Sequence, residues 1–270
     1  MPLSLLVLAG VGCTGRTIVV VDPNTCSDSG STSCTAHLTD DLIGFWRLDD
    51  GTGSAVARDR SLWSNDGTLT GLDPTTAWVA DGPEGVALAP YGKGYVKVLD
   101  STSIDSITDE VTVAAWVYLD GTIAAGDFAT AISRQIGTTY DQHYHLSINS
   151  DHQAALYVTP ARLTYIHSDS TVPSQTWVHL AGTYDGSQSH LYVGGIEVAS
   201  TTATGSFAAE TNPVILSGNG NAVGNVVSEL FPGRLDEIML YRRALSADEI
   251  KRIEGGALIS PAAHTDAGGQ

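Results

Sequence analysis

The sequence predicts an all-β fold, an antiparallel β-sandwich with one short helix near the C-terminus. Short runs of residues alternate apolar with polar, and turn dipeptides separate them: Asp-Gly at 66–67, 120–121 and 185–186, and Gly-Gly at 194–195. This pattern is typical of antiparallel hairpins and disfavours a parallel sheet. With 270 residues, 42% of them hydrophobic, the chain is long enough for one large sandwich with its own core.

The most detailed prediction concerns the stretch Phe231–Ile250, which reads as a strand running into a helix. A regular strand places two sets of side chains on opposite faces: Leu235, Glu237, Met239 and Tyr241 on one, and Asp236, Ile238 and Leu240 on the other. Ser246 and Glu249 have the spacing of a capping box. We therefore predict a helix over about 247–253, ended by the glycines at 255 and 256.

Five sequence blocks share a fixed order along the chain: an opening strand and loop, a second loop, a strand, a hairpin, and the closing strand with its helix. They are Leu42–Gly53, Arg58–Leu69, Val111–Val117, Trp177–Val198 and Gly233–Ile250. Together they resemble the laminin-G-like domains of the concanavalin A-like jelly-roll superfamily over about residues 40 to 254. The resemblance implies a jelly-roll sandwich, glycan or protein ligands and often a structural calcium. One departure is Gly194, where that family usually has an Asp, so this turn lacks a polar ligand.

The N-terminal residues predict export. Leu3–Val11 is an apolar run too short to span a bilayer, and it ends in small residues before Cys13. The arrangement resembles a bacterial lipoprotein signal, which implies cleavage after residue 12 and a lipid on Cys13. We therefore expect a protein anchored by lipid in the cell envelope, in the outer membrane or at the cell surface, with plain secretion as the alternative.

Export also determines how the remaining cysteines and the chain segments are interpreted. Cys26 and Cys34 are an even pair in an oxidising compartment, so we expect a disulfide between them. Zinc ligation is the alternative, but His and Cys partners at zinc spacing are missing nearby. Residues 13–39 then form a tether, 40–255 the sandwich domain and 256–270 a disordered tail.

The net charge of −17 limits the classes of molecule that the protein can bind. Phosphate contacts depend on Lys and Arg, of which the chain has 13 against 30 Asp and Glu, so nucleic-acid binding is disfavoured. Acids that converge can instead hold calcium, which prefers oxygen ligands. We expect Asp236 to bind calcium with acids of the opening loop: Asp49, Asp50 or Asp59. The alternative partners of Asp236 are backbone N–H groups or an arginine, Arg47 or Arg58.

Catalytic patterns are absent from the sequence. It has no P-loop, no H-E-x-x-H, no G-x-S-x-G and no closely spaced run of three carboxylates of the type found in jelly-roll glycosidases. Asp236 and Glu237 are adjacent, and on a regular strand they face opposite ways. We therefore expect a protein that is not an enzyme.

Candidate ligand-binding residues fall into two groups. His143 and His145 share one face of a predicted strand, where they can chelate a metal, line a sugar groove or simply be half-exposed. The apolar set of the same strand, Tyr144, Leu146 and Ile148, is expected to pack inward. Aromatic residues in loop-like segments are candidates for stacking on a ligand: Trp63, Trp78, Tyr91 and Tyr95.

The function that follows is a surface binding or adhesion module that recognises glycans, as the family resemblance implies. Two alternatives stay open: a protein–protein adhesion or scaffold module without sugar binding and, last, a glycoside hydrolase or lyase.

Overall fold

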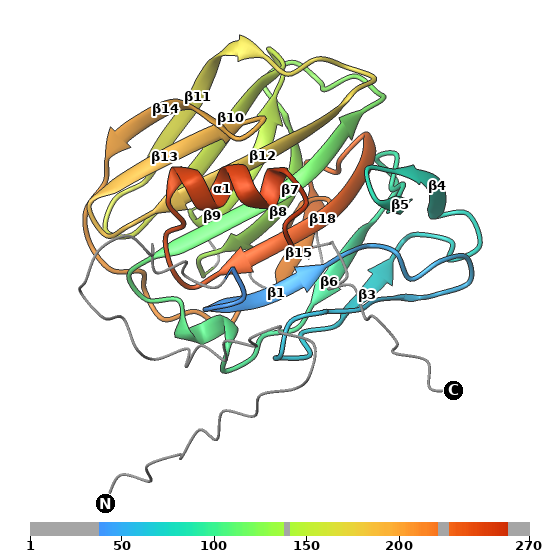
Figure 1. Ribbon diagram of the computed structural model, residues 1–270, viewed down its shortest axis with the longest axis horizontal. Helices are drawn as coiled ribbons and strands as arrows, with labels where there is room; N and C mark the ends of the chain where they lie inside the picture. Colours follow the sequence, from blue (N-terminus) through green and yellow to red (C-terminus); the bar gives the residue numbers. More distant parts are fainter. Residues whose placement is uncertain (1–37, 138–140, 221–226, 259–270) are drawn as a thin grey trace, which may run out of the picture. The chain divides into compact units, whose positions relative to one another are not determined.

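Two antiparallel sheets pack face to face in the computed structural model, which describes residues 38–137, 141–220 and 227–258 (Figure 1). Sheet A has the order β14-β13-β12-β7-β18-β5-β4, and β1 also pairs with β18. Its strands are β1 (Leu42–Trp46), β4 (Trp78–Gly82), β5 (Gly85–Leu88), β7 (Val111–Leu119), β12 (Trp177–Tyr184), β13 (Gln188–Val193), β14 (Ile196–Thr202) and β18 (Gly233–Tyr241).

Sheet B has the order β11-β10-β9-β8-β15-β6-β3-β2. Its strands are β2 (Val56–Ala57), β3 (Gly67–Thr70), β6 (Tyr95–Val98), β8 (Phe128–Gln135), β9 (Gln142–Asn149), β10 (Gln153–Val158), β11 (Thr164–Thr171) and β15 (Val214–Leu216). A separate pair, β16 (Asn219–Gly220) and β17 (Val227–Ser228), follows β15. The predicted all-β antiparallel sandwich is confirmed.

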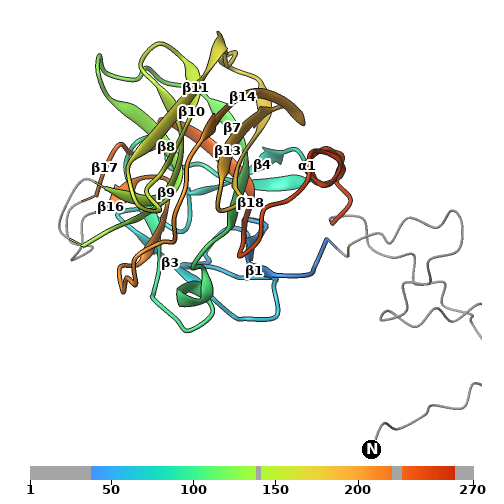
Figure 2. The same ribbon diagram turned by 90° about the vertical axis from the view of Figure 1, so that its left-hand side faces the viewer.

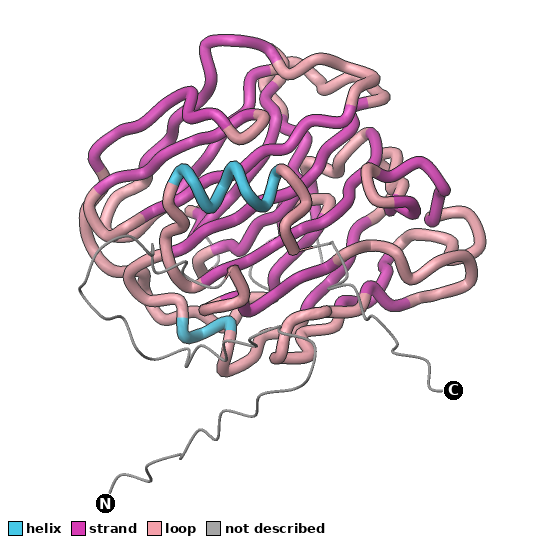
Figure 3. Tube along the Cα trace, in the orientation of Figure 1, coloured by secondary structure: helices cyan, strands magenta, loops and turns pink. Residues whose placement is uncertain are grey.

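Helical structure among the described residues is confined to the 3₁₀ turn η1 (Ile104–Ser106) and the helix α1 (Ala247–Glu254), drawn in cyan in Figure 3. The predicted capping box is present at the start of α1: Glu249 N donates to Ser246 Oγ, and Ser246 N donates to Glu249 Oε2 at 2.9 Å. These bonds satisfy backbone N–H groups that the first helical turn leaves open. Among the described residues, no helix has the length and apolar character needed to cross a membrane.

The apolar core lies between the sheets and draws on the inner faces of both, with Trp46, Val113, Leu146 and Leu180 among its fully buried members. A second cluster lies under α1, on the outer face of sheet A, where Ile250 packs with Ala114 and Ala181. These two alanines face each other across β7 and β12, and their small side chains let the helix approach the sheet. Figure 2 shows α1 on one side of the sandwich and β16–β17 on the other.

Strand β18 departs from the predicted alternation. Its pairing with β7 shifts between Asp236 and Met239, and Glu237 has a left-handed backbone with φ 48°. Leu235 and Ile238 both belong to the core, although three positions apart residues should face opposite ways. Ile238 with Leu240, and Met239 with Tyr241, share faces as predicted. The core face that Ile238 occupies, however, is that of Leu235 and not that of Asp236. A β-bulge adds one residue, so that neither Asp236 nor Glu237 points into the core.

Strands β1 and β18 lie side by side, with Trp46 opposite Ile238. This pairing brings the opening loop close to the acids of β18, because Arg47 directly follows β1. The residues of the predicted signal peptide and nearly all of the tether, with Cys13, Cys26 and Cys34, lie outside the described residues, as does most of the predicted tail.

Candidate ligand-binding site

The outer face of sheet B, on the side away from the core, carries the two histidines of β9. Tyr144, Leu146 and Ile148 are fully buried in the core, as predicted, which turns His143 and His145 to the opposite face. The expectation that these histidines look out into solvent is wrong: they are only 1% and 2% exposed. Side chains from other segments cover them, because Phe207 stacks on His143 and Glu229 contacts His145.

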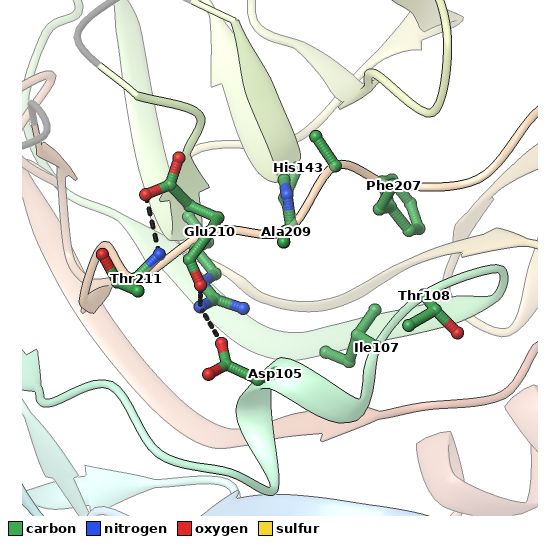
Figure 4. A pocket seen from close by; sticks show the side chains of 10 residues that line it. Asp105, Ile107, Thr108, His143, Phe207, Ala209, Glu210 and Thr211 are labelled. Carbon is green, nitrogen blue, oxygen red and sulfur yellow. Dashed lines mark hydrogen bonds and ion pairs between the residues drawn. The ribbon is translucent and has the colours of Figure 1, made fainter.

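A cavity of about 380 Å³ opens beside His143 (Figure 4). Its walls come from η1 and the turn after it, from β8 and β9, and from the segment that leads from β14 to β15. The lining residues are Asp105, Ile107, Thr108, Arg134, His143, Phe207, Ala208, Ala209, Glu210 and Thr211. His143 and Phe207 lie along one side of it, and Ile107 and Thr108 lie along the other.

Arg134 forms the fixed floor of this cavity, because its side chain is 1% exposed. Its Nη2 donates to Asp100 Oδ1 at 2.8 Å, to Asp105 Oδ1 at 2.7 Å and to the Glu210 carbonyl at 2.7 Å. Nη1 and Nε donate to two more carbonyls, those of Ile104 and Asn212. A guanidinium held by two carboxylates and three carbonyls ties η1 to the 210–212 segment and has little charge left for a ligand.

His143 is a buried polar side chain in the cavity wall. Neither ring nitrogen makes a hydrogen bond of good geometry with the described residues, although the Ala208 backbone lies near enough to act on the pKa of the ring. The ring stacks on Phe207 with centroids 5.2 Å apart and planes 29° from parallel. Burial, helped by the Arg134 charge, lowers the pKa of His143 to about 4, although the Ala208 backbone, Glu210 and Asp105 act in the opposite direction. The ring is therefore neutral at physiological pH, with one N–H donor and one acceptor.

A row of rings crosses the same face from β8 to β11, and we call it the aromatic row: Phe128, His145, Tyr157, Tyr165 and His167. Tyr157 faces both His145 and Tyr165 across the strands, with ring centroids 5.2 Å and 4.4 Å away. Phe128 meets His145 and Tyr157 edge to face. Tyr165 stands on the edge strand β11 and is 39% exposed, so the row ends at an accessible ring.

A polar cluster lies beside the row at His145. Its Nε2 is 2.6 Å from Thr130 Oγ1 and 3.1 Å from Glu229 Oε2, and Thr130 also donates to Glu229 at 3.0 Å. Burial works to raise the pKa of Glu229, but the bonds and charge of His145, with bonds from Thr130 and Asn219, outweigh it and leave the pKa lowered. Hydroxyl and carboxylate share one ring nitrogen here, whereas a nucleophile triad uses both nitrogens. The contacts from Thr130 and Glu229 therefore hold the His145 ring in place and do not form such a triad.

The aromatic residues predicted for ligand stacking are not brought together. Trp78 is 6% exposed and its Nε1 donates to the Ser54 carbonyl at 2.8 Å, so the stacking prediction fails for this core residue. Trp63 is 46% exposed and lies near the Arg242 guanidinium. Tyr91 is 44% exposed and its backbone N–H donates to Gly233, while Tyr95 lies half-buried on β6. None of the four lines the cavity or belongs to the aromatic row.

The acids predicted to hold calcium have other partners. Asp59 accepts backbone N–H groups from Phe45, Ser61 and Asn65, each at 2.8 Å. Asp49 pairs with Arg47 and Arg60, and Asp50 accepts the Arg58 N–H. In the part of the chain that the structure describes, no three His, Cys, Asp or Glu side chains are grouped to hold a metal. Because these acids already have protein partners, their arrangement does not fit a calcium site. The calcium expected from the sequence is a prediction that a binding experiment has to test.

Several site residues escaped the sequence analysis. Arg134, Phe207 and Glu210 come from two segments more than 70 positions apart, so local patterns carry no sign of their meeting. Tyr157 and Tyr165 could have been found, because each is next to core residues of alternating strands, Leu156 and Ile166. Pairing those strands as a hairpin would have placed the two tyrosines opposite each other.

The chain is an antiparallel two-sheet sandwich with an aromatic row and a polar cavity on one outer sheet face. Residues 91–251, more than half of the chain, match the family model of the concanavalin A-like lectin/glucanases superfamily, of laminin-G type. The chain therefore belongs to this superfamily, which confirms the resemblance seen in the sequence blocks. A search of curated proteins gave no significant match.

Solved structures share the fold at low sequence identity. Domain 4 of AbnA, an extracellular arabinanase from Geobacillus stearothermophilus seen with arabinotriose, is 19% identical with a TM-score of 0.60, over 79% of this chain and 98% of that one. The binding domain of Paraclostridial Mosquitocidal Protein 1 is 17% identical, with a TM-score of 0.62 over 83% of this chain and 54% of that one. Trypanosoma rangeli sialidase is 16% identical, with a TM-score of 0.58, and the match spans 81% of this chain but only 33% of the sialidase.

Proposed function

We propose that this protein is a non-catalytic glycan-binding module, and that it binds through the outer face of sheet B. The observation that carries the proposal is the aromatic row, whose exposed end at Tyr165 lies on the same face as the His143 cavity. Sugar rings offer apolar C–H faces that pack on aromatic rings and hydroxyls that need polar partners. The aromatic row supplies rings for the apolar faces, and the cavity and the cluster at His145 supply polar partners for the hydroxyls.

The superfamily and its neighbours support this proposal. One neighbour by fold, the arabinanase domain, carries an oligosaccharide in its structure. Burial raises the pKa of Tyr157 to about 12, with Tyr165 and Glu229 adding to the effect, so its hydroxyl remains a hydrogen-bond donor at all physiological pH values.

A protein–protein adhesion module is the second candidate, and it rests on a different surface. Strand β14 forms an edge of sheet A and exposes Ile196 (68%) and Val198 (37%). An exposed edge strand with apolar side chains can pair with a strand of another protein. Substitution of these two residues would weaken such an interaction and leave glycan binding unchanged.

Anchoring in the cell envelope is part of the proposal and rests on the sequence alone. The apolar run before Cys13 and the even pair of remaining cysteines support an exported lipoprotein. A membrane-bound binding module would hold its sandwich near the cell surface, where polysaccharides are the abundant ligands.

A glycan array probed with the full chain tests the proposed function. We expect selective binding to a subset of saccharides and at least a tenfold loss with Tyr165→Ala. Tyr91→Ala is the matched comparison, because Tyr91 is a similarly exposed tyrosine outside the row. Loss of binding with Tyr91→Ala and not with Tyr165→Ala would place the site elsewhere. Binding to no saccharide would leave the adhesion module as the function, and turnover of a bound polysaccharide would show an enzyme.

A further inference from the structure

We propose that the cavity beside His143 receives a single uncharged sugar unit, and that His143 reads one of its hydroxyls. This inference rests on the proposed function and makes it more specific, because it selects neutral over acidic saccharides. It is carried by three features of the cavity: its size, its buried imidazole and its surplus of carboxylates.

The size and walls of the cavity suit one sugar ring. Its volume of about 380 Å³ is at the small end of the range of small-molecule sites, roughly 300 to 1,000 Å³. Ile107 and Phe207 provide apolar surface, and Thr108 and Thr211 provide hydroxyl groups around it. The cavity and the aromatic row are neighbours on this face, because His143 and His145 are two residues apart on one strand face, a spacing of about 7 Å.

The imidazole of His143 is buried without a well-formed hydrogen bond to the described residues. A buried polar group left without a hydrogen bond is unfavourable, so such groups are rare in folded proteins. His143 is 1% exposed, neither of its nitrogens makes a hydrogen bond of good geometry in the described part of the chain, and the Ala208 backbone can act as a partner for only one of them. A neutral imidazole has one donor and one acceptor nitrogen, and a sugar hydroxyl can bond either of them because it both donates and accepts. A carboxylate only accepts, so it can bond only the nitrogen that carries the proton.

The charges around the cavity exclude acidic ligands. Arg134 is the one cation among the lining residues, and Asp100 and Asp105 already bind its Nη2. Glu210 adds a further carboxylate to the lining, held by the Thr211 and Asn212 backbone N–H groups. An incoming carboxylate or sulfate would meet two acids and a guanidinium that is already paired. Burying it there without a free cation is unfavourable.

The test compares a neutral hexose trimer with its uronic acid counterpart, which carries a carboxylate in place of the hydroxymethyl group, and adds a neutral pentose trimer; the full chain is the protein. The probes are arabinotriose, galactotriose and the trimer of galacturonic acid, and the affinity of each is measured by titration calorimetry. We expect at least one neutral trimer to bind at least tenfold more tightly than the acidic trimer. We expect His143→Phe, which keeps the stack on Phe207 and removes both nitrogens, to weaken that binding at least tenfold.

A second variant guards against misfolding of the first. Ala209 lines the cavity with an exposed side chain, so Ala209→Leu narrows the cavity without disturbing the core. Its control is Ala55→Leu, at another exposed alanine, before β2. Loss of binding only in Ala209→Leu supports the inference. Tighter binding of the acidic trimer, or neutral binding that neither His143→Phe nor Ala209→Leu weakens, overturns the inference while the proposed function stands. Failure of every saccharide on the array overturns both.

Discussion

Asp236 and Glu237 are neighbours in sequence whose carboxyl groups lie together, buried on the side of β18 that faces away from the core. They are 0% and 1% exposed, and Glu237 N donates to Asp236 Oδ1 at 3.0 Å. Glu237 Oε1 accepts from Arg47 Nε at 3.3 Å, while Asp236 Oδ2 and Glu237 Oε2 lack partners among the described residues. The left-handed Glu237 creates this pairing, which a regular strand forbids.

Burial is the main cause that raises the pKa of both acids. The pKa of Asp236 rises to about 8, with the charge of Glu237 as the second cause, and that of Glu237 rises to about 7 despite the opposing Arg47 charge. Asp236 is therefore largely protonated at neutral pH, which removes the need for a cation beside it. The calcium and arginine partners expected from the sequence both presupposed an ionised Asp236.

The first prediction is that Asp236 and Glu237 lower stability as pH rises from about 4 to about 8. Below about pH 6.5 His143 and His179 act in the opposite direction, because burial lowers their pKa values to about 4 and about 3, so the effect of the acids is isolated by comparing wild type with a variant of Asp236. Across this window the folded protein keeps protons on Asp236 and Glu237 that the unfolded chain has already released, so rising pH favours unfolding. Asp236→Asn cannot ionise, and we expect it to gain stability relative to wild type between pH 5 and pH 8.5 in urea unfolding. Asp151→Asn, at an exposed position, is the control. Identical pH profiles for Asp236→Asn and wild type would refute the prediction.

The second prediction is that Arg134→Met destabilises the sandwich strongly. The substitution removes the guanidinium from Asp100 and Asp105, whose side chains are 27% and 40% exposed, and leaves three carbonyls without their donor; each buried polar group left unsatisfied costs about 1–3 kcal/mol. Arg60→Met removes an arginine that is 42% exposed and should cost less than about 1 kcal/mol. Urea unfolding measures both. Equal effects of the two variants would show that Arg134 does not organise the cavity.

The third prediction is that Asp59 is held by backbone hydrogen bonds and does not bind calcium. Because Asp59 already accepts three backbone N–H groups, we expect EDTA to leave the melting temperature unchanged and Asp59→Asn to cost roughly 1–3 kcal/mol. A melting temperature that rises with calcium concentration and falls with EDTA would instead support the calcium site expected from the sequence.

The fourth prediction is lipidation of Cys13, which lies outside the described residues. Globomycin, an inhibitor of the lipoprotein signal peptidase, should cause an uncleaved precursor to accumulate. Labelled fatty acid should be incorporated into wild type and absent from Cys13→Ala. Cleavage that continues in the presence of the drug would indicate plain secretion.

The sequence by itself determined the features whose causes are local. Ser246 and Glu249 start α1 because a capping box acts over three residues, and β9 buries Tyr144 and Leu146 because alternation within one strand fixes its apolar face. Five blocks in order were enough to identify the superfamily, since they record the strand sequence of the whole sandwich.

Only the tertiary structure decided the site. One left-handed residue, Glu237, shifted the faces of β18, and no apolar pattern announces such a bulge. His143 reads as an outward-facing side chain in the sequence, and it is buried because Phe207, 64 positions later (207 − 143 = 64), folds over it. The cavity, Arg134 with its acids, and the aromatic row all depend on contacts between distant segments. Chain topology makes those contacts, and local residue preference does not encode them.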